Sequence, residues 1–206
     1  MNIYQKAASG AGNAEPLIRS DHRVLANDSS ADGRFLLYQS QDTKTGWDLW
    51  VLPLSGEQKA FTVLQTPFDE SHGRFSPDGR WIVYTSNETG IQQVYVLSFP
   101  ASGGKWLVSI NGGTQPQWRR DGKELFYLSP NRKLMAVEVK ENGSTLEAGV
   151  PKELFEVPFP PEGIARGRNE YAVSADGQRF LVVSAADEMP ATPTTVVLNW
   201  TAELKP

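Results

Sequence analysis

The feature that most constrains the fold of this chain is an Asp-Gly dipeptide that recurs four times, each time followed by a polar position and an apolar run. Asp and Gly both tolerate the positive φ of a tight turn, so each copy predicts a hairpin between two strands. We assign the four aspartates to structure, because their carboxylates can accept backbone N–H bonds within the turn. They are Asp32, Asp78, Asp121 and Asp176.

The spacing of these turns sets the size of the repeat. Intervals of 46, 43 and 55 residues each match one four-stranded blade of a β-propeller, in which antiparallel blades surround a central tunnel. We therefore predict an all-β β-propeller of about four full blades plus a partial blade from the N-terminus, within a single domain over 1–206. The predicted units are roughly 20–66, 67–111, 112–157 and 168–206, with strands in 2–19 completing or extending the ring.

Apolar runs supply the remaining strands of each unit. Their alternation is only partial, as expected where both faces of a sheet pack against neighbouring blades. Third strands are predicted to begin at Trp47, Ile91, Lys133 and Thr194, and weaker fourth strands at Lys59, Lys105 and Lys152.

The two ends of the chain leave the predicted ring incomplete. NIYQKAA and AEPLIRS at the N-terminus read as a third and a fourth strand without the first two strands of their own blade, and the last unit has no evident fourth strand. Unpaired strand edges invite association, so we favour closure, in which an N-terminal strand completes the last blade. The alternative is an open fragment whose blade edges pair with a second copy to give a homodimer.

Composition narrows the classes of partner. The formal charge is −4, with 20 basic and 24 acidic residues mixed along the chain, so there is no basic stripe and we expect no nucleic-acid partner. No run approaches the roughly 18 apolar residues that a membrane span needs, and no signal peptide is predicted. The absence of cysteine excludes disulfides and thiolate metal sites but leaves the cellular compartment open.

Two resemblances extend this interpretation. The run FSPDGRWIVYTSNETGIQQVYVLSF resembles the repeat of TolB-type, WD-repeat-like propellers. The run GGTQPQWRRDGKELFYLSPNRKLMAVEV and the ending TVVLNWTAELK are similar to the C-terminal propeller of bacterial transmembrane Ser/Thr protein kinases. The second resemblance implies a bacterial sensor module of a larger receptor, which would place the chain in the periplasm or elsewhere outside the cytoplasm. The chain itself contains no kinase motif.

The innermost strand of each blade lines a propeller's tunnel, so residues just before each turn are candidates for a site. Aligning the units on the turn aspartate gives one level six positions before it and a second level four positions before it. The first level contains Ala26, His72, Gln115 and Glu170, and the second contains Asp28, Arg74, Gln117 and Ala172. We take the polar members of both levels as candidate ligand-binding residues.

The first level also offers a hypothetical metal site. His72, Gln115 and Glu170, with Glu70 and Asp28 nearby, present oxygen and imidazole groups that can bind a divalent cation such as calcium. Only one imidazole contributes, and a polar tunnel that holds water is the favoured interpretation. A zinc site with three histidines is excluded, because His22 and His72 are the only histidines.

We therefore expect a non-catalytic propeller that binds a protein, a peptide or a small molecule at one mouth of its tunnel, an expectation that depends mainly on fold analogy. The alternative is a promiscuous metal-assisted hydrolase of the esterase, phosphotriesterase or lactonase kind, with His72, Glu170 and Glu70 as its candidate catalytic residues.

Overall fold

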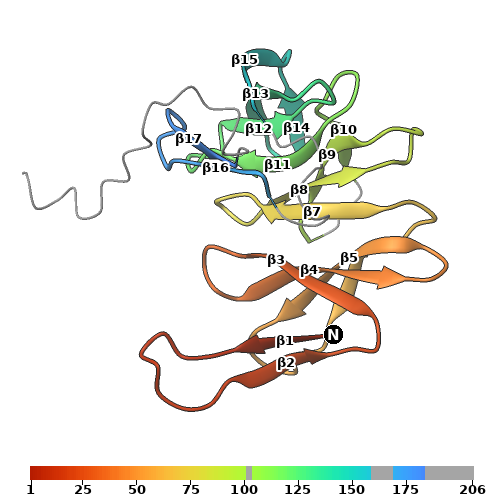
Figure 1. The fold of residues 1–206 in the computed structure, drawn as a ribbon, viewed down its shortest axis with the longest axis vertical. Helices are drawn as coiled ribbons and strands as arrows, with labels where there is room; N and C mark the ends of the chain where they lie inside the picture. The colour runs from red at the N-terminus through yellow and green to blue at the C-terminus, as the bar shows by residue number, and fades with distance from the viewer. Residues whose placement is uncertain (101–103, 159–168, 184–206) are drawn as a thin grey trace, which may run out of the picture.

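The computed structural model describes residues 1–100, 104–158 and 169–183. Within these ranges the chain forms antiparallel β-strands, β1 to β17, and no helix (Figure 1). The sheets follow one another in chain order, and of the three complete blades two have four antiparallel strands and the third has five. The predicted all-β propeller is thereby confirmed. No described helix has the length and hydropathy to span a membrane.

Each complete blade begins with its innermost strand. Blade 1 contains β3 (Arg23–Ser29), β4 (Phe35–Asp42), β5 (Gly46–Pro53) and β6 (Phe61–Leu64). Blade 2 contains β7 (Glu70–Phe75), β8 (Trp81–Ser86), β9 (Gln93–Ser98) and β10 (Lys105–Leu107). Blade 3 contains β11 (Thr114–Trp118), β12 (Glu124–Leu128), β13 (Lys133–Asn142) and β15 (Lys152–Glu156), with β14 (Thr145–Ala148) as an addition.

The chain ends form two smaller sheets. β1 (Asn2–Gln5) pairs with β2 (Glu15–Arg19), and β16 (Tyr171–Val173) pairs with β17 (Phe180–Val182). These two pairs are separate sheets; in Figure 1 the first lies at the bottom of the view and the second lies on the left of the upper half. The third strand predicted from Thr194 lies outside the described residues, so closure of the ring and the homodimer both stay predictions.

The Asp-Gly turns have the predicted structural role. In each turn the aspartate Oδ1 accepts the backbone N–H two residues later, at 3.0 to 3.1 Å. The following glycine has a φ of +70° to +73°, which other residues rarely adopt. In three turns a serine two residues before the aspartate donates its hydroxyl to the carboxylate; these are Ser30, Ser76 and Ser174.

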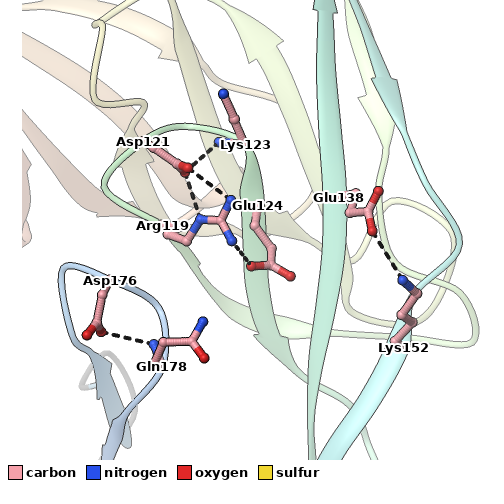
Figure 2. A network of polar contacts seen from close by, with 8 residues as sticks. All are labelled: Arg119, Asp121, Lys123, Glu124, Glu138, Lys152, Asp176 and Gln178. Atoms are coloured by element: carbon pink, nitrogen blue, oxygen red, sulfur yellow. Dashed lines mark hydrogen bonds and ion pairs between the residues drawn. The ribbon is translucent and has the colours of Figure 1, made fainter.

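The third turn replaces this serine with an arginine. Arg119 donates from Nε and Nη2 to the two oxygens of Asp121, at 2.8 and 2.9 Å, and from Nη1 to Glu124 at 2.7 Å. Figure 2 shows this network beside the fourth turn, where the N–H of Gln178 binds Asp176. A guanidinium therefore supplies the hydrogen bonds to the turn carboxylate that a serine hydroxyl supplies in the other turns.

We expect the substitution Asp78→Ala to lower the free energy of unfolding by about 1 kcal/mol, because it removes the acceptor of the Ser76 hydroxyl and the Arg80 N–H. Urea denaturation followed by circular dichroism measures this loss. Asp21→Ala is the control, since the described residues show no partner for that exposed side chain. Equal loss in both variants would contradict the structural role of the turn aspartate.

The hydrophobic core lies between blades. All residues of β8 and β9 are buried, because both faces of blade 2 are covered. One face packs against Leu37, Leu49 and Val51 of blade 1, and the other packs against blade 3. A third cluster joins blade 3 to Tyr171 of β16. This layering brings the inner strands β3, β7, β11 and β16 together.

Blade 3 differs from the prediction in one respect. Its fourth strand was correctly expected from Lys152, and β15 pairs with β13 there. However, β13 continues to Asn142 and forms a hairpin with β14, which was not predicted. Asn142 pairs with Thr145, so the two-residue loop is Gly143 and Ser144, and Gly143 at φ +64° has the first-position glycine typical of type II′ hairpins. The sequence therefore contained the signal for this extra hairpin.

Candidate functional site

The inner strands enclose a cavity of about 660 Å³, which we call the inner-strand cavity. Four inner strands and β17 contribute to its wall, and the inner strands bring the whole second level of the alignment together. Its lining includes Asp28 of β3, Arg74 of β7, Gln117 of β11 and Ala172 of β16. The sequence alignment on the turn aspartate thus predicted one wall residue from each inner strand.

Asp28 and Arg74 connect blades 1 and 2 at this wall. Asp28 Oδ2 accepts the backbone N–H of Phe75 at 3.0 Å, and Arg74 Nη1 donates to the carbonyl of Asn27 at 2.7 Å. The two charged groups approach to 3.6 Å, and both side chains are about a quarter exposed. Burial raises the pKa of Asp28, while the Arg74 charge and the Phe75 N–H act in the opposite direction.

Gln117 and Gln115 connect blade 3 to β16. Gln117 Nε2 donates to the carbonyl of Tyr171 at 2.6 Å, and the Tyr171 hydroxyl donates to the carbonyl of Gln115 at 2.9 Å. Gln115 itself is buried, and its Oε1 accepts the backbone N–H of Glu170 at 2.6 Å. The structure therefore brings Gln115 and Glu170 together, as the sequence alignment predicts. The contact uses the backbone N–H of Glu170 rather than its carboxylate.

His72 and Gln115 are not among the described residues that line the cavity. The pairing of each inner strand with the next strand slips by one residue at this place, between Ser71 and Arg74 and again between Thr114 and Gln117. Both His72 and Gln115 have a φ of +55°, in the left-handed region that non-glycine residues rarely adopt. This bulge interrupts the regular alternation of side chains, so the two aligned levels do not both face the cavity.

Gln39 is a polar partner that the sequence analysis missed. It lies on β4 with 2% of its surface exposed, and its Oε1 accepts from Asn27 Nδ2 at 3.0 Å and from the His72 N–H at 3.2 Å. The side chain therefore satisfies the backbone of the bulge across the blade boundary. Its position within the otherwise strand-like run FLLYQSQD gave no signal of that role.

Glu70 lies at the start of β7 and is not a lining residue of the inner-strand cavity. It is 1% exposed, and the Thr66 hydroxyl donates to its Oε1. Its Oε2 is buried without a hydrogen-bond partner among the described residues. Burial raises the pKa of Glu70 to about 7, and the charges of Asp48 and Glu88 act in the same direction.

The donors proposed for a metal do not form a set that fits a divalent cation. Burial lowers the pKa of His72 to about 4, with a further contribution from the Arg74 charge, and its Nδ1 lies 3.0 Å from the Ser71 hydroxyl. The imidazole is therefore neutral near pH 7, as a metal ligand must be. However, the amide oxygen of Gln115 already accepts a hydrogen bond from the backbone N–H of Glu170. In the described part of the chain, no three His, Asp or Glu side chains gather to hold a metal.

No protein-family model matches the sequence, and no curated protein matches it. Solved structures share its fold. A protein from Agrobacterium tumefaciens that carries the name TolB is 16% identical with a TM-score of 0.56, over 73% of this chain and 60% of that one. The periplasmic gluconolactonase PpgL of Pseudomonas aeruginosa is 18% identical with a TM-score of 0.56, over 88% of this chain and 55% of that one.

An oligogalacturonate lyase in complex with manganese has a TM-score of 0.58 and 12% identity, over 84% of this chain and 48% of that one. The chain thus spans about half the length of these structures. At such identities the likeness shows the fold alone, which is a β-propeller. Because binding proteins and enzymes both use this fold, function has to be argued from the site.

Proposed function

We propose that this chain is a non-catalytic binding module whose ligand site is the inner-strand cavity. The observation that carries the proposal is the convergence of Asp28, Arg74, Gln117 and Tyr171, from four inner strands, on one cavity of about 660 Å³. A concave site of this volume with a few polar groups among apolar walls is typical of small-molecule and peptide sites. The ligand is a small molecule or a segment of a peptide or protein.

The proposal extends to a sensor module of a bacterial receptor kinase, located outside the cytoplasm. Its support is the resemblance of the runs around Trp118 and Trp200 to the propellers of such kinases. The cavity lies between strands of different blades, which suits a sensor. A bound ligand would change the stability of the contacts between those blades.

No geometry of the described residues favours the alternative of a metal-assisted hydrolase. His72 and Glu70 are not among the described residues of the cavity wall, and no three metal-ligating side chains gather among the described residues. Assay of activated esters with added divalent cations tests this alternative. Metal-dependent turnover that is lost in both His72→Ala and Glu170→Ala would contradict a non-catalytic function.

We expect the substitution Ala172→Phe to abolish ligand binding, because Ala172 is exposed at the cavity wall and a phenyl group there would occupy the site. Thermal shift against peptides, sugars and organic acids identifies ligands of the unmodified protein. A ligand at about a hundredfold its Kd should add about 2.7 kcal/mol of stability to the unmodified protein and none to the variant.

Thr62→Phe is the matched control, because it adds the same group at an exposed position of β6 in blade 1. This variant should retain the full ligand-induced stabilisation. Equal stabilisation of Ala172→Phe by the ligand would place its site elsewhere, and no binding by any of these classes would contradict the binding function itself.

A further inference from the structure

The charge at the inner-strand cavity is carried by two side chains. Among its described lining residues only Asp28 and Arg74 are charged, and they lie 3.6 Å apart, beyond hydrogen-bond distance. Asp28 is fixed by the N–H of Phe75, whereas Arg74 donates through Nη1 to the carbonyl of Asn27. A guanidinium has five N–H groups. The Nε and Nη2 groups of Arg74 have no partner among the described residues.

A second donor without a partner belongs to the same wall. Trp118 is 8% exposed, and its Nε1 is buried with no hydrogen-bond partner among the described residues. Buried donors are normally satisfied, but this atom is shielded from the open cavity, and the Nε1 atoms of Trp50 and Trp81 also lack partners among the described residues. The donors that a ligand can reach at this wall are therefore the Nε and Nη2 groups of Arg74, which an acceptor group on the ligand would satisfy.

Most of the remaining wall is apolar, beside the polar Ser29, Ser76, Gln117 and Asn169. Phe75, Trp118 and Tyr171 contribute aromatic surface, and the strand β17 contributes Leu181 and Val182. An apolar group bound in the cavity would cover this surface and gain about 25 cal/mol for each Å² removed from water.

We propose that the inner-strand cavity binds an apolar carboxylate, with Arg74 as its anchoring cation. The planar fork of a guanidinium matches a carboxylate, which would share Arg74 with the carboxylate of Asp28. A doubly charged phosphate fits less well, because the carboxylate of Asp28 lies beside the same guanidinium. A free organic acid and the C-terminal residue of a peptide share this chemistry. The inference rests on the proposed function and names its ligand class.

Isothermal titration calorimetry with matched ligands tests the proposal. The small-molecule pair is 4-phenylbutyrate and 4-phenylbutyramide, and the peptide pair is acetyl-Gly-Gly-Phe with a free or an amidated C-terminus. We expect at least one acid to bind and its amide to bind at least tenfold more weakly. The arm with the tighter acid identifies the source as a free acid or a peptide C-terminus.

Three variants then locate the contact. Arg74→Gln should weaken binding of the acid at least tenfold and remove the preference for acid over amide, and Arg74→Lys should restore part of that preference. Arg34→Gln is the matched control, because Arg34 is exposed and pairs with Asp32 at a turn. It should leave both affinities unchanged.

Failure of this inference is distinguishable from failure of the proposed function. Equal affinity for acid and amide in the unmodified protein, with both lost in Ala172→Phe, would overturn carboxylate recognition and leave the cavity as a binding site. Because this comparison uses the unmodified protein, it does not depend on the folding of an Arg74 variant. Acid binding that persists in Ala172→Phe would overturn the inference, and absence of binding by all four ligands would do the same.

Discussion

The substitution Trp81→Ala is expected to lower the free energy of unfolding by about 3–5 kcal/mol, the range for truncating a buried large aromatic side chain. Trp81 begins β8, is 2% exposed, and contacts the ring of Trp106 edge to face at 5.2 Å between centroids. It shares one buried cluster with Trp118 and Val137 of blade 3. The loss should therefore affect the contact between two blades as well as blade 2.

Packing alone accounts for this expected loss, because the Nε1 of Trp81 has no hydrogen-bond partner among the described residues. Urea denaturation monitored by circular dichroism measures it. Trp47→Ala is the matched control, since Trp47 is only half-buried and packs against the guanidinium of Arg23 at 5.6 Å. It should cost clearly less than Trp81→Ala, because part of the Trp47 side chain is already in water in the folded protein. Similar losses in the two variants would contradict the assignment of blade contacts as the main source of stability.

The Asp-Gly turns made the fold predictable from the sequence because their chemistry is local. Asp78 and Gly79 need only their own neighbours to form the turn, and the hydrogen bond from Arg80 is the one that the dipeptide implies. Once the turns are aligned, blade length follows from spacing. The same alignment identified Arg74 and Gln117 as wall residues, because positions just before the turn lie on the regular part of each inner strand.

The places of His72 and Gln115 could not be predicted in this way, because they depend on contacts between blades. Each sits at a bulge with φ +55°, and neither is a residue type that signals such a conformation. What stabilises the bulge at His72 is the side chain of Gln39, which is 33 residues away in sequence. The alternation of side chains with a period of two along a strand cannot predict this change in side-chain direction.

The repeat also does not predict the identity of the ligand. Solved structures of similar fold include a gluconolactonase and a lyase, so the fold specifies a scaffold and leaves the chemistry of the cavity to single positions. Trp118 illustrates this point, because it belongs to the hydrophobic cluster between blades 2 and 3, where packing alone would explain an aromatic side chain. Only the assembled inner strands show that its ring also lines a cavity.

Glu70 is expected to make the stability of the protein depend on pH in the direction opposite to that of an ion-paired carboxylate. Burial raises its pKa from the ordinary value of 4.5 to about 7. Below pH 4.5 the side chain is protonated in both the folded and the unfolded protein, so it causes no penalty. Between pH 4.5 and 7 the folded protein keeps a proton that the unfolded chain releases, so the free energy of unfolding falls as pH rises.

Above pH 7 the buried carboxylate is ionised in both states, and the accumulated penalty should level off at about 3 kcal/mol. Glu70→Gln keeps the shape of the side chain and removes the charge, so this variant should be more stable than the unmodified protein by about that amount at pH 8.5. At pH 4 the two proteins should be nearly equally stable. Urea denaturation at several pH values measures both curves.

Glu57→Gln is the matched control, because Glu57 is exposed and the described residues show no partner for it. Its curve should run parallel to that of the unmodified protein. The neighbouring carboxyl group of Asp48 is also 1% exposed, has one oxygen without a partner among the described residues, and has a pKa that burial raises. Part of the fall in stability with rising pH should therefore persist in Glu70→Gln and be removed in the double variant with Asp48→Asn. The lowered pKa of His72 makes stability rise with pH, and this opposite dependence should remain in both variants. Parallel curves for Glu70→Gln and the unmodified protein would mean that Glu70 is ionised in the fold at little cost. That result would require a compensating positive charge or an acceptor of the proton at the boundary between blades 1 and 2.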